Sequence, residues 1–429
     1  MTINQKEHAQ PDSADSGIFY GYVIVAAAAV IMMAAFGAHY AFGIFFKPIL
    51  NEFGWSRMLV SGAFSISWLF HALSCLVMGR LNDRLGPRFV LTLSGIILSG
   101  GFLLSTGIDA VWKLYLFYGA LVGIGTGGIF IPLVSTIARW FVLRRTIMTG
   151  IAVAGIGVGT LVMPLIASRL IAIFDWQTAY AVLGIAVLII IVVGSLFLKR
   201  DPSKAGQLPF GHGQSRANPL QQDDAGFTLK EAAGTPQLWL VISAFLCFGF
   251  FTYAILVHIS PHATDLGVSI TTAANLVAAF GVASIFGKVV LGNIGDRIGN
   301  RNIFLLCFAL VALSSIWVSG SRQTWVLYLY AMAIGIAYGG CSASFSPLVA
   351  VLFGLKSIGQ IAGVANSGYA MGAMVGPLMA GILYDLTGSY RIFFYVIALV
   401  ATIGFFLTLA LNQHKLAIPV ACHGDSERN

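Results

Sequence analysis

The stretch Gly79-Arg80-Leu81-Asn82-Asp83-Arg84-Leu85-Gly86-Pro87-Arg88 decides the fold of this chain, because it occurs twice. The second copy is Gly292-Asn293-Ile294-Gly295-Asp296-Arg297-Ile298-Gly299-Asn300-Arg301, 213 positions later. Two glycines, an Asp-Arg pair and the final arginine recur at the same places, and each copy is predicted to be a charged turn between two apolar runs. The repeat is far longer than a solenoid unit of about 20 to 50 residues. It therefore predicts two copies of a large module.

Other residues recur at the same shift. The further pairs are Tyr40 with Tyr253, Pro48 with Pro261, Gly150 with Gly363, Gly155 with Gly368, Gly159 with Gly372, and Pro164 with Pro377. Because spaced glycines and a proline recur late in each copy, we expect a tightly packed and kinked helix in each module.

The composition of the chain is that of a membrane protein. Its residues are 58% hydrophobic and 9% charged, against roughly 25% charged in a soluble domain. An apolar run of about 20 residues can cross a hydrocarbon core, and a run of this kind must be helical to satisfy its backbone in lipid. The runs fall at 20–44, 57–79, 88–107, 112–136, 145–171, 175–198, 237–260, 271–294, 302–319, 325–350, 360–383 and 391–412. We therefore expect an all-α membrane protein with twelve transmembrane helices in two pseudo-symmetric six-helix bundles.

One long polar interval divides these spans into two sets of six. The expected parts are a tail at 1–19, a bundle at 20–198, a linker at 199–235, a bundle at 236–412 and a tail at 413–429. With the N-terminus inside, 17 of the 24 Lys and Arg residues lie on the cytoplasmic side and 6 on the other. This asymmetry follows the positive-inside rule. We expect a multi-pass protein of the inner (plasma) membrane with both termini in the cytoplasm.

Several other classes of protein are not expected. The formal charge of +8 comes from cations in short loops, so it reports topology and predicts no nucleic-acid partner. The run Gly123-Ile124-Gly125-Thr126-Gly127-Gly128 matches a dinucleotide pattern, but no βαβ unit surrounds it, and we interpret it as a helix-packing stripe. The five cysteines are too scattered for a disulfide framework. No catalytic constellation, metal site or cofactor motif is visible, so we do not expect an enzyme.

Lys288 is the most informative polar residue inside a span. It precedes Asp296 by 8 residues, roughly 12 Å of helix rise, and an ionisable residue at that depth is a functional hypothesis. The alternative is a lysine that snorkels to the cytoplasm. Its repeat counterpart is Cys75, so the symmetric scaffold does not require a cation. Apart from Asp175 at the first position of the sixth span, no span contains Asp or Glu, so we expect the partner of this buried ammonium to be an anionic substrate, a carboxylate.

Other residues are expected to shape a pocket around Lys288. Ser284 lies one helical turn away on the same face, and Gly281 is expected to open space beside it. The further residues predicted to bind substrate are Tyr40, His258, Phe130, Tyr338 and Asn366, with His39, His71, Ser342 and Tyr369 as additional polar neighbours. For each of them the alternative is an ordinary packing residue.

These motifs resemble those of a known family. The stretch at 79–88 and its copy resemble the loop motif of the major facilitator superfamily. The segments 40–48, 53–57 and 139–155 resemble the monocarboxylate transporters and the related bacterial oxalate:formate antiporters. The resemblance implies the major facilitator fold, with alternating access by rocking of the two bundles. It also implies that a cation on the eighth span, here Lys288, binds the substrate carboxylate.

The resemblance further implies a gate, and this chain departs from its relatives at several positions. The gate would latch the cytoplasmic side in the outward-open state and would be formed by Asp83, Arg84, Arg88, Arg139, Asp296 and Arg297. The relatives carry arginine where this chain has Lys288, and lysine offers a point charge instead of a fork. Met371 replaces the second cation of the oxalate carriers, which favours a monocarboxylate. Tyr40 and Ser284 replace a lysine and an aspartate of the animal members, so their proton-coupling scheme does not carry over directly.

These observations predict a secondary active transporter of small monocarboxylates such as lactate, with a proton in symport. Lys288 itself could hold the coupling proton when the anion arrives. An exchanger or exporter of organic anions without proton coupling is one alternative, and a membrane sensor that binds a carboxylate without moving it is another. We expect the substrate and the lipid bilayer as partners, protons as the coupling ion, no cofactor and no obligate protein partner.

Overall fold

The computed structural model describes residues 19–141, 145–211, 226–354 and 358–411, and the side chains of Asp83 and Asp296 lie outside this description. The first half is helical almost throughout. Its elements are α1 (Tyr20–Tyr40), α2 (Phe42–Phe53), α3 (Arg57–Leu85), α4 (Pro87–Ser105), α5 (Val111–Leu114), the π-helical η1 (Tyr115–Val122), α6 (Gly123–Trp140), α7 (Arg145–Ile173) and α8 (Trp176–Leu196).

The second half follows a connecting segment with two short helices. These are the 3-10 helix η2 (Pro202–Ala205) and α9 (Leu229–Ala233). The long helices after them are α10 (Pro236–Asp265), α11 (Ile270–Ile298), α12 (Asn300–Val318), α13 (Thr324–Phe353), α14 (Ile358–Thr387) and α15 (Arg391–Leu409).

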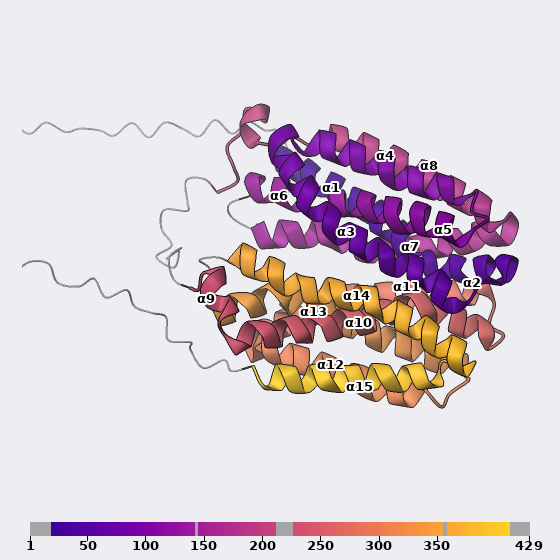
Figure 1. The fold of residues 1–429 in the computed structure, drawn as a ribbon. Coiled ribbons are helices and arrows are strands. Elements are labelled where there is room, and N and C mark those ends of the chain that lie inside the picture. The colour runs from indigo at the N-terminus through magenta and orange to yellow at the C-terminus, as the bar shows by residue number, and fades with distance from the viewer. Residues whose placement is uncertain (1–18, 142–144, 212–225, 355–357, 412–429) are drawn as a thin grey trace, which may run out of the picture.

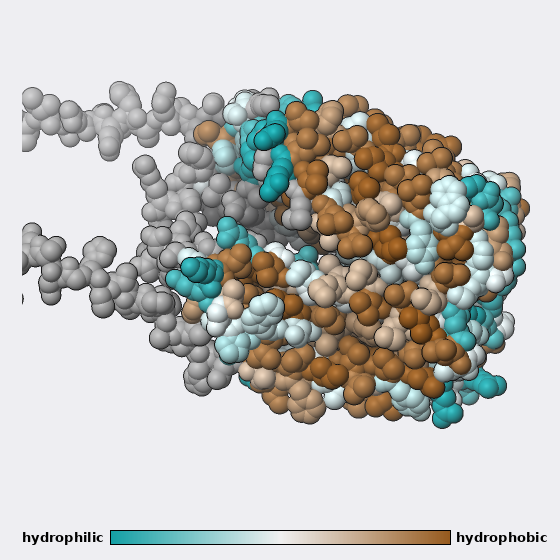
Figure 2. Space-filling model, in the orientation of Figure 1, coloured by the Kyte–Doolittle hydropathy of each residue, from teal (hydrophilic) through white to brown (hydrophobic). Residues whose placement is uncertain are grey.

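Twelve segments of the described residues are long and apolar enough to cross a membrane. Large apolar side chains face outward in the middle of the molecule, as at Leu313 and Ile189, which are 69% and 56% exposed. Figure 2 shows hydrophobic residues, in brown, over most of the visible flank of the molecule between its two ends. Such a surface is stable in lipid and not in water. The prediction of an all-α protein with twelve transmembrane helices is confirmed.

The helices form two bundles that lie side by side (Figure 1). The first bundle contains α1 to α8 and the second contains α10 to α15. We call the end of the molecule with η2 and α9 the linker end, at the left of Figure 1, and the opposite end, where α2 and α10 finish, the far end.

Glycines give both bundles the same internal packing. A Cβ on Gly155 of α7 would lie 2.2 Å from the Ala29 carbonyl oxygen of α1. A Cβ on the equivalent Gly368 of α14 would lie 2.1 Å from the Ile242 carbonyl oxygen of α10. Only a residue without a side chain allows so close an approach. The repeated glycines are therefore helix-packing sites, as the sequence predicts.

Two predicted boundaries are wrong. The first span does not end at residue 44, because the chain resumes a helix after Ala41 and ends it only at Gly54, where φ is 64°. The repeated charged stretch is not a ten-residue turn either, since α3 continues to Leu85. The chain turns at Gly86 and at its repeat counterpart Gly299, with φ of 84° and 90°, and a glycine adopts such angles without strain.

Candidate functional site

The two bundles meet along α3 with α14 and α7 with α11, and α2 packs against α10. The middle of this interface holds a tyrosine triad, Tyr40, Tyr253 and Tyr369. The Tyr40 and Tyr253 hydroxyl oxygens lie 3.0 Å apart, and the Tyr369 hydroxyl donates to that of Tyr253 at 2.9 Å. The ring of Trp68 packs 4.5 Å from that of Tyr253. These groups from α1, α3, α10 and α14 join the bundles at mid-depth.

Lys288 lies on α11 next to this cluster. Its Nζ atom is 5.3 Å from the ring centroid of Tyr338, a distance at which an ammonium is attracted to an aromatic face. Tyr338 in turn lies beside Tyr369 and Ser342. Lys288 is half-buried and has no carboxylate partner among the described residues. The structure therefore brings the predicted residues Lys288, Tyr338 and Tyr40 to one region.

Phe130 and Asn366 border the same region. The ring of Phe36 links Phe130 to the triad, with centroids 6.4 Å from Phe130 and 6.0 Å from Tyr40. Asn366 is exposed and precedes Tyr369 on α14 by nearly one helical turn, on the side of the linker end. Phe130 thus contributes to the apolar wall of the first bundle, and Asn366 lies at the edge of the region.

Ser284 is placed differently from the prediction. Its hydroxyl is buried and donates to the Gly281 carbonyl oxygen of its own helix at 2.8 Å. Gly281 does not open space, because a Cβ there would lie 2.8 Å from the Leu161 nitrogen of α7. Gly157 faces the same contact, since a Cβ on it would lie 3.5 Å from the Ser284 oxygen. Ser284 therefore lies in the tight crossing of α7 and α11.

His258 lies away from Lys288, toward the far end. Its Nδ1 is 2.8 Å from the Tyr390 hydroxyl and its Nε2 is 3.0 Å from the Pro377 carbonyl oxygen. Both ring nitrogens are thus engaged within the second bundle, so the imidazole has no free nitrogen for a substrate. Burial raises the pKa of the Tyr390 hydroxyl, which keeps it protonated and able to donate.

A network that the sequence analysis missed closes the far end. The Arg57 guanidinium, on the first turn of α3, forms an ion pair of 2.6 Å with Asp265 of α10 and donates to the Tyr390 hydroxyl at 2.7 Å. It also stacks 3.6 Å over the Tyr384 ring of α14. Lys47 of α2 adds a second ion pair to Asp265 at 2.9 Å. These groups join the two bundles by charge.

Asp385 of α14 adds a further contact to this network. We call the whole network the far-end latch; its residues are Lys47, Arg57, Asp265, Tyr384, Asp385 and Tyr390. The Asp385 carboxylate accepts hydrogen bonds from the backbone nitrogens of Arg57 and Met58, at 2.9 and 2.8 Å. A carboxylate at a helix N-terminus satisfies donors that have no intrahelical partner and interacts favourably with the helix dipole. Because Asp385 belongs to α14 and the capped helix is α3, this cap also spans the interface.

Two arginines of the repeated stretch brace their own bundles. Arg88 donates to the Leu198 carbonyl oxygen at 2.5 Å, and its counterpart Arg301 donates to the Thr408 carbonyl oxygen at 3.1 Å. Each therefore places a cation at the C-terminal end of the last long helix of its bundle, where the helix dipole favours it. Arg88 is predicted to belong to the gate between the bundles, but the contact that it makes here, with Leu198, lies within the first bundle.

The remaining gate residues lie at the linker end. Arg139 forms an ion pair of 3.1 Å with Asp201, and Arg84 and Arg297 are exposed. The side chains of Asp83 and Asp296 lie outside the described residues. The gate at this end stays a prediction.

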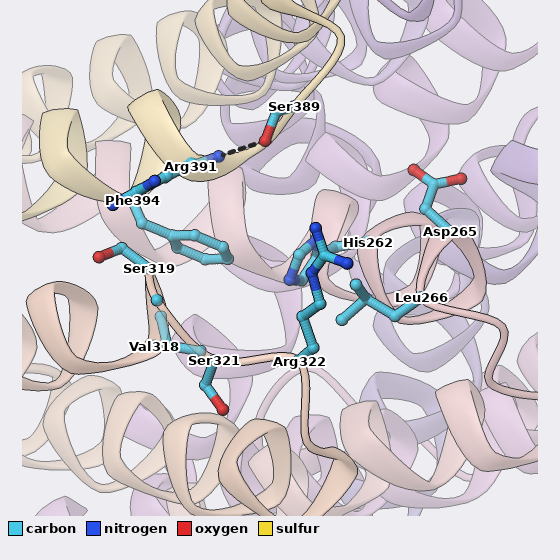
Figure 3. Close-up of a pocket in the computed structure, with 11 residues that line it drawn as sticks. His262, Asp265, Leu266, Val318, Ser319, Ser321, Arg322, Ser389, Arg391 and Phe394 are labelled. Carbon is cyan, nitrogen blue, oxygen red and sulfur yellow. Dashed lines mark hydrogen bonds between the residues drawn. The ribbon is translucent and has the colours of Figure 1, made fainter.

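A separate pocket of about 570 Å³ opens at the far end within the second bundle. Figure 3 shows Arg322 beside His262, with Phe394 and Arg391 on the opposite side. The lining residues belong to α10 and to the ends of α12 and α15 and their loops. Because no residue of the first bundle lines it, rocking of the bundles would not expose it alternately to the two sides.

The arrangement can now be compared with known proteins. A sequence profile of the Major Facilitator Superfamily matches residues 24–269 and 257–419. The chain belongs to this superfamily. Proteins of the superfamily are transporters and not enzymes, which confirms that expectation.

Relatives within the superfamily have modest identity to the chain. Monocarboxylate transporter 11 of Homo sapiens is 27% identical over 406 residues, covering 92% of this chain and 83% of that protein. The uncharacterized MFS-type transporter YhjX of Escherichia coli (strain K12) is 26% identical over 351 residues, covering 80% of this chain and 84% of that protein. The predicted resemblance to monocarboxylate transporters is confirmed.

A solved structure supports the fold. The crystal structure of a bacterial homolog of the human lysosomal transporter Spinster, described as inward-facing and unoccupied, matches with a TM-score of 0.69 at 18% identity. The match covers 91% of this chain and 95% of that one. This similarity confirms the major facilitator fold.

Proposed function

We propose that this protein is a secondary active transporter of small monocarboxylates, coupled to protons in symport. The observation that carries the proposal is Lys288, a half-buried cation on α11, the helix of the second bundle that packs on α7, with no carboxylate partner among the described residues. A desolvated ammonium without a counter-ion is costly. A bound carboxylate would remove that cost, so the site favours an anion.

The groups around Lys288 suit a substrate with one charged end. The two hydrogen bonds within the triad use two of its three hydroxyl protons, so Tyr40 or Tyr253 keeps one that can donate to a carboxylate oxygen, and Tyr338 lies beside them with a further hydroxyl. The Trp68 Nε1 atom is buried without a hydrogen-bond partner among the described residues. The rings of Phe36 and Phe130 offer an apolar wall for a short carbon tail. Polar and apolar groups are thus present together, as in small-molecule sites.

The uncharged residue at position 371 favours one carboxylate over two. Met371 of α14 is 51% exposed and, by the resemblance to the oxalate carriers, stands where they have a second cation. A dicarboxylate bound by Lys288 alone would leave one charge unpaired in a region of low dielectric. The names of the relatives, monocarboxylate transporters, support the same substrate class.

The contacts between bundles suggest how transport would proceed. The far-end latch and the tyrosine triad close the far half of the interface. Toward the linker end, no described atom outside their own helix backbone and chain neighbours lies within 4 Å of the point that a Cβ would occupy on the repeat-related Gly150 and Gly363. If the linker end lies in the cytoplasm, as the distribution of cations predicts, this arrangement is that expected of an inward-facing state, and we place the transporter in the plasma membrane as part of the proposal. Rocking of the bundles would break the latch and admit substrate from outside.

Transport assays in proteoliposomes test the proposal. Radiolabelled lactate and a panel of other monocarboxylates would be offered with and without an inward proton gradient, beside protein-free liposomes. We expect gradient-driven uptake of at least one member of the panel. Exchange that is indifferent to the gradient would identify an anion exchanger instead, and binding in detergent without uptake in vesicles would identify a sensor.

A further inference from the structure

The four histidines of the described residues differ in what their ring nitrogens contact. The two nitrogens of His258 both bond within the second bundle. His39 bonds Ser67 through Nε2 at 2.9 Å, and its Nδ1 is sealed from solvent. The Nε2 of His262 is likewise sealed, no hydrogen bond to a described residue anchors its ring, and it lines the far-end pocket away from the candidate site. His71 remains as the histidine with one anchored nitrogen and one unoccupied nitrogen that is not sealed.

The tautomer of His71 follows from its neighbour. Its Nδ1 lies 3.2 Å from the Thr126 hydroxyl oxygen. The single proton of that hydroxyl has two acceptors in its own helix, the carbonyl oxygens of Val122 and Gly123, at 2.9 and 3.0 Å. With the proton directed to them, Thr126 accepts from the His71 Nδ1–H group. In the neutral ring the lone pair then lies on Nε2, which is free to accept a proton.

The imidazole belongs to the wall of the candidate site. Its ring centroid lies 4.9 Å from that of Trp68, which packs on the triad, and 6.2 Å from that of Phe36. Phe36 in turn contacts Tyr40 and Phe130. By the repeat, His71 corresponds to Ser284, one helical turn from Lys288 in the second bundle. His71 and Lys288 thus occupy the first and second bundle at similar depth.

The other titratable groups near this imidazole carry no negative charge. Among the described residues they are His39 and Tyr40 on α1, Cys75 on α3, Tyr253 on α10 and Tyr369 on α14. Tyr118 on η1 donates to the His39 carbonyl oxygen, and the cation Lys288 lies on α11 at similar depth. On α6, the residues that lie against His71 are Thr126 and Gly127, and both are uncharged. The carboxylates whose side chains are described lie at helix ends or in loops. Among the carboxylates that the structure describes, none lies at this level to compete for the proton.

We propose that His71 is the group that carries the coupling proton, an inference that rests on the proposed monocarboxylate symport. The Nε2 lone pair accepts a proton from hydronium on the proton-rich side, forming an N–H bond and leaving water. The reverse step releases the proton on the other side. A carboxylate bound at Lys288 lowers the positive potential of the site and so favours the protonated ring. By linkage, the protonated ring favours binding of the carboxylate by the same factor.

The substitution His71→Asn tests this role. The Asn amide can still donate to Thr126, but it has no basic lone pair. Full-length protein in proteoliposomes would be assayed with radiolabelled lactate, or the best monocarboxylate of the panel, in two ways: exchange at equal pH on both sides, and accumulation driven by an inward proton gradient. We expect exchange to persist while gradient-driven accumulation falls to the level without a gradient. The control is His262→Asn, outside the site, which should accumulate like the wild type.

Three outcomes would overturn the proposal. The first is accumulation by His71→Asn equal to that of the wild type. The second is monodisperse His71→Asn protein that has lost exchange as well, which would make His71 a substrate ligand or a structural residue. If the variant does not purify as a monodisperse protein, Lys288→Arg decides. Arginine does not release its proton, so it cannot carry the coupling proton. If Lys288→Arg keeps gradient-driven accumulation, the result supports His71. If Lys288→Arg loses gradient-driven accumulation but keeps exchange, which is the third outcome, the coupling proton belongs to Lys288. A wild type without gradient-driven uptake of any monocarboxylate in the panel would instead refute the proposed function.

Discussion

The hydroxyl oxygens of Tyr40 and Tyr253, residues one repeat length of 213 apart, lie 3.0 Å from each other. Equivalent residues of the two bundles therefore meet directly, which places the pseudo-symmetry axis between them. Any rocking of one bundle against the other must change this contact. The tyrosine triad is thus both a lining of the candidate site and part of the closure of the far half.

Lys288→Ala is expected to abolish or greatly weaken monocarboxylate uptake. A hydrogen bond to a charged group contributes about 1.5–3 kcal/mol, which corresponds to a rise in KM of about 10- to 100-fold. The measurement is the initial rate of uptake against substrate concentration in proteoliposomes. The control is Lys113→Ala, which removes a lysine paired with Asp109 outside the interface. Undiminished uptake by Lys288→Ala would leave Lys288 a snorkelling residue.

Tyr253→Phe is expected to affect transport more than stability. The substitution removes the hydroxyl that links Tyr40 and Tyr369, a change of about 0.5–1.5 kcal/mol per hydrogen bond. Uptake kinetics and the thermal unfolding midpoint would be measured together. Tyr330→Phe is the control, since its hydroxyl bonds Ser315 within the second bundle at 3.1 Å. If both variants transport alike, the triad has no role in the transport cycle.

Breaking the far-end latch is expected to open the far side. Removing one partner of a buried ion pair costs about 3–5 kcal/mol, and less is expected for Arg57→Leu because Asp265 is 21% exposed. We therefore expect the equilibrium constant between the closed and the far-open state to shift at least about tenfold toward the far-open state, which corresponds to about 1.4 kcal/mol. The readout is labelling of Ser61→Cys, buried at the interface, by an impermeant maleimide added from outside, in a protein whose native cysteines are replaced by serine.

The control for the latch is Asp109→Asn, which breaks the Lys113–Asp109 pair of the first bundle alone. It should label as slowly as the parent protein. Equal labelling with and without Arg57 would show that the latch does not determine the conformational equilibrium.

Two glycines of α14 are expected to respond oppositely to alanine. A Cβ on Gly372 would lie 2.0 Å from the Leu246 carbonyl oxygen, whereas on Gly363 no described atom outside its own helix backbone and chain neighbours lies within 4 Å of that position. Gly372→Ala should lower the free energy of unfolding by about 1–3 kcal/mol, as overpacking does. Gly363→Ala should leave it unchanged or raise it, because alanine favours the helix. Thermal unfolding in detergent measures both, and equal midpoints would contradict the packing.

The wrong boundaries have a common physical origin. Hydropathy marks where a helix leaves the apolar region, but Arg80 to Leu85 stay helical beyond it, since a helix in polar surroundings still satisfies its backbone. The chain turns only where Gly86 adopts a positive φ. Sequence alone identifies the glycine and not how far the helix extends before it.

What the sequence by itself determined is the scaffold and its most informative residue. Apolar runs of membrane length predict helices, the repeat predicts two similar bundles, and the sequence spacing of Lys288 and Asp296 predicts a cation inside a span. These follow from local composition and spacing. Tyr253 could also have been found this way, as the repeat counterpart of Tyr40.

Only the tertiary structure decided which side chains meet. It placed His258 with Tyr390 instead of Lys288, and put Ser284 in a helix crossing. It also joined Arg57 to Asp265 and Asp385, residues over 200 positions away. The sequence carries no direct signal for such pairs, because the rotation of each helix about its axis is set by packing against neighbours from the other bundle.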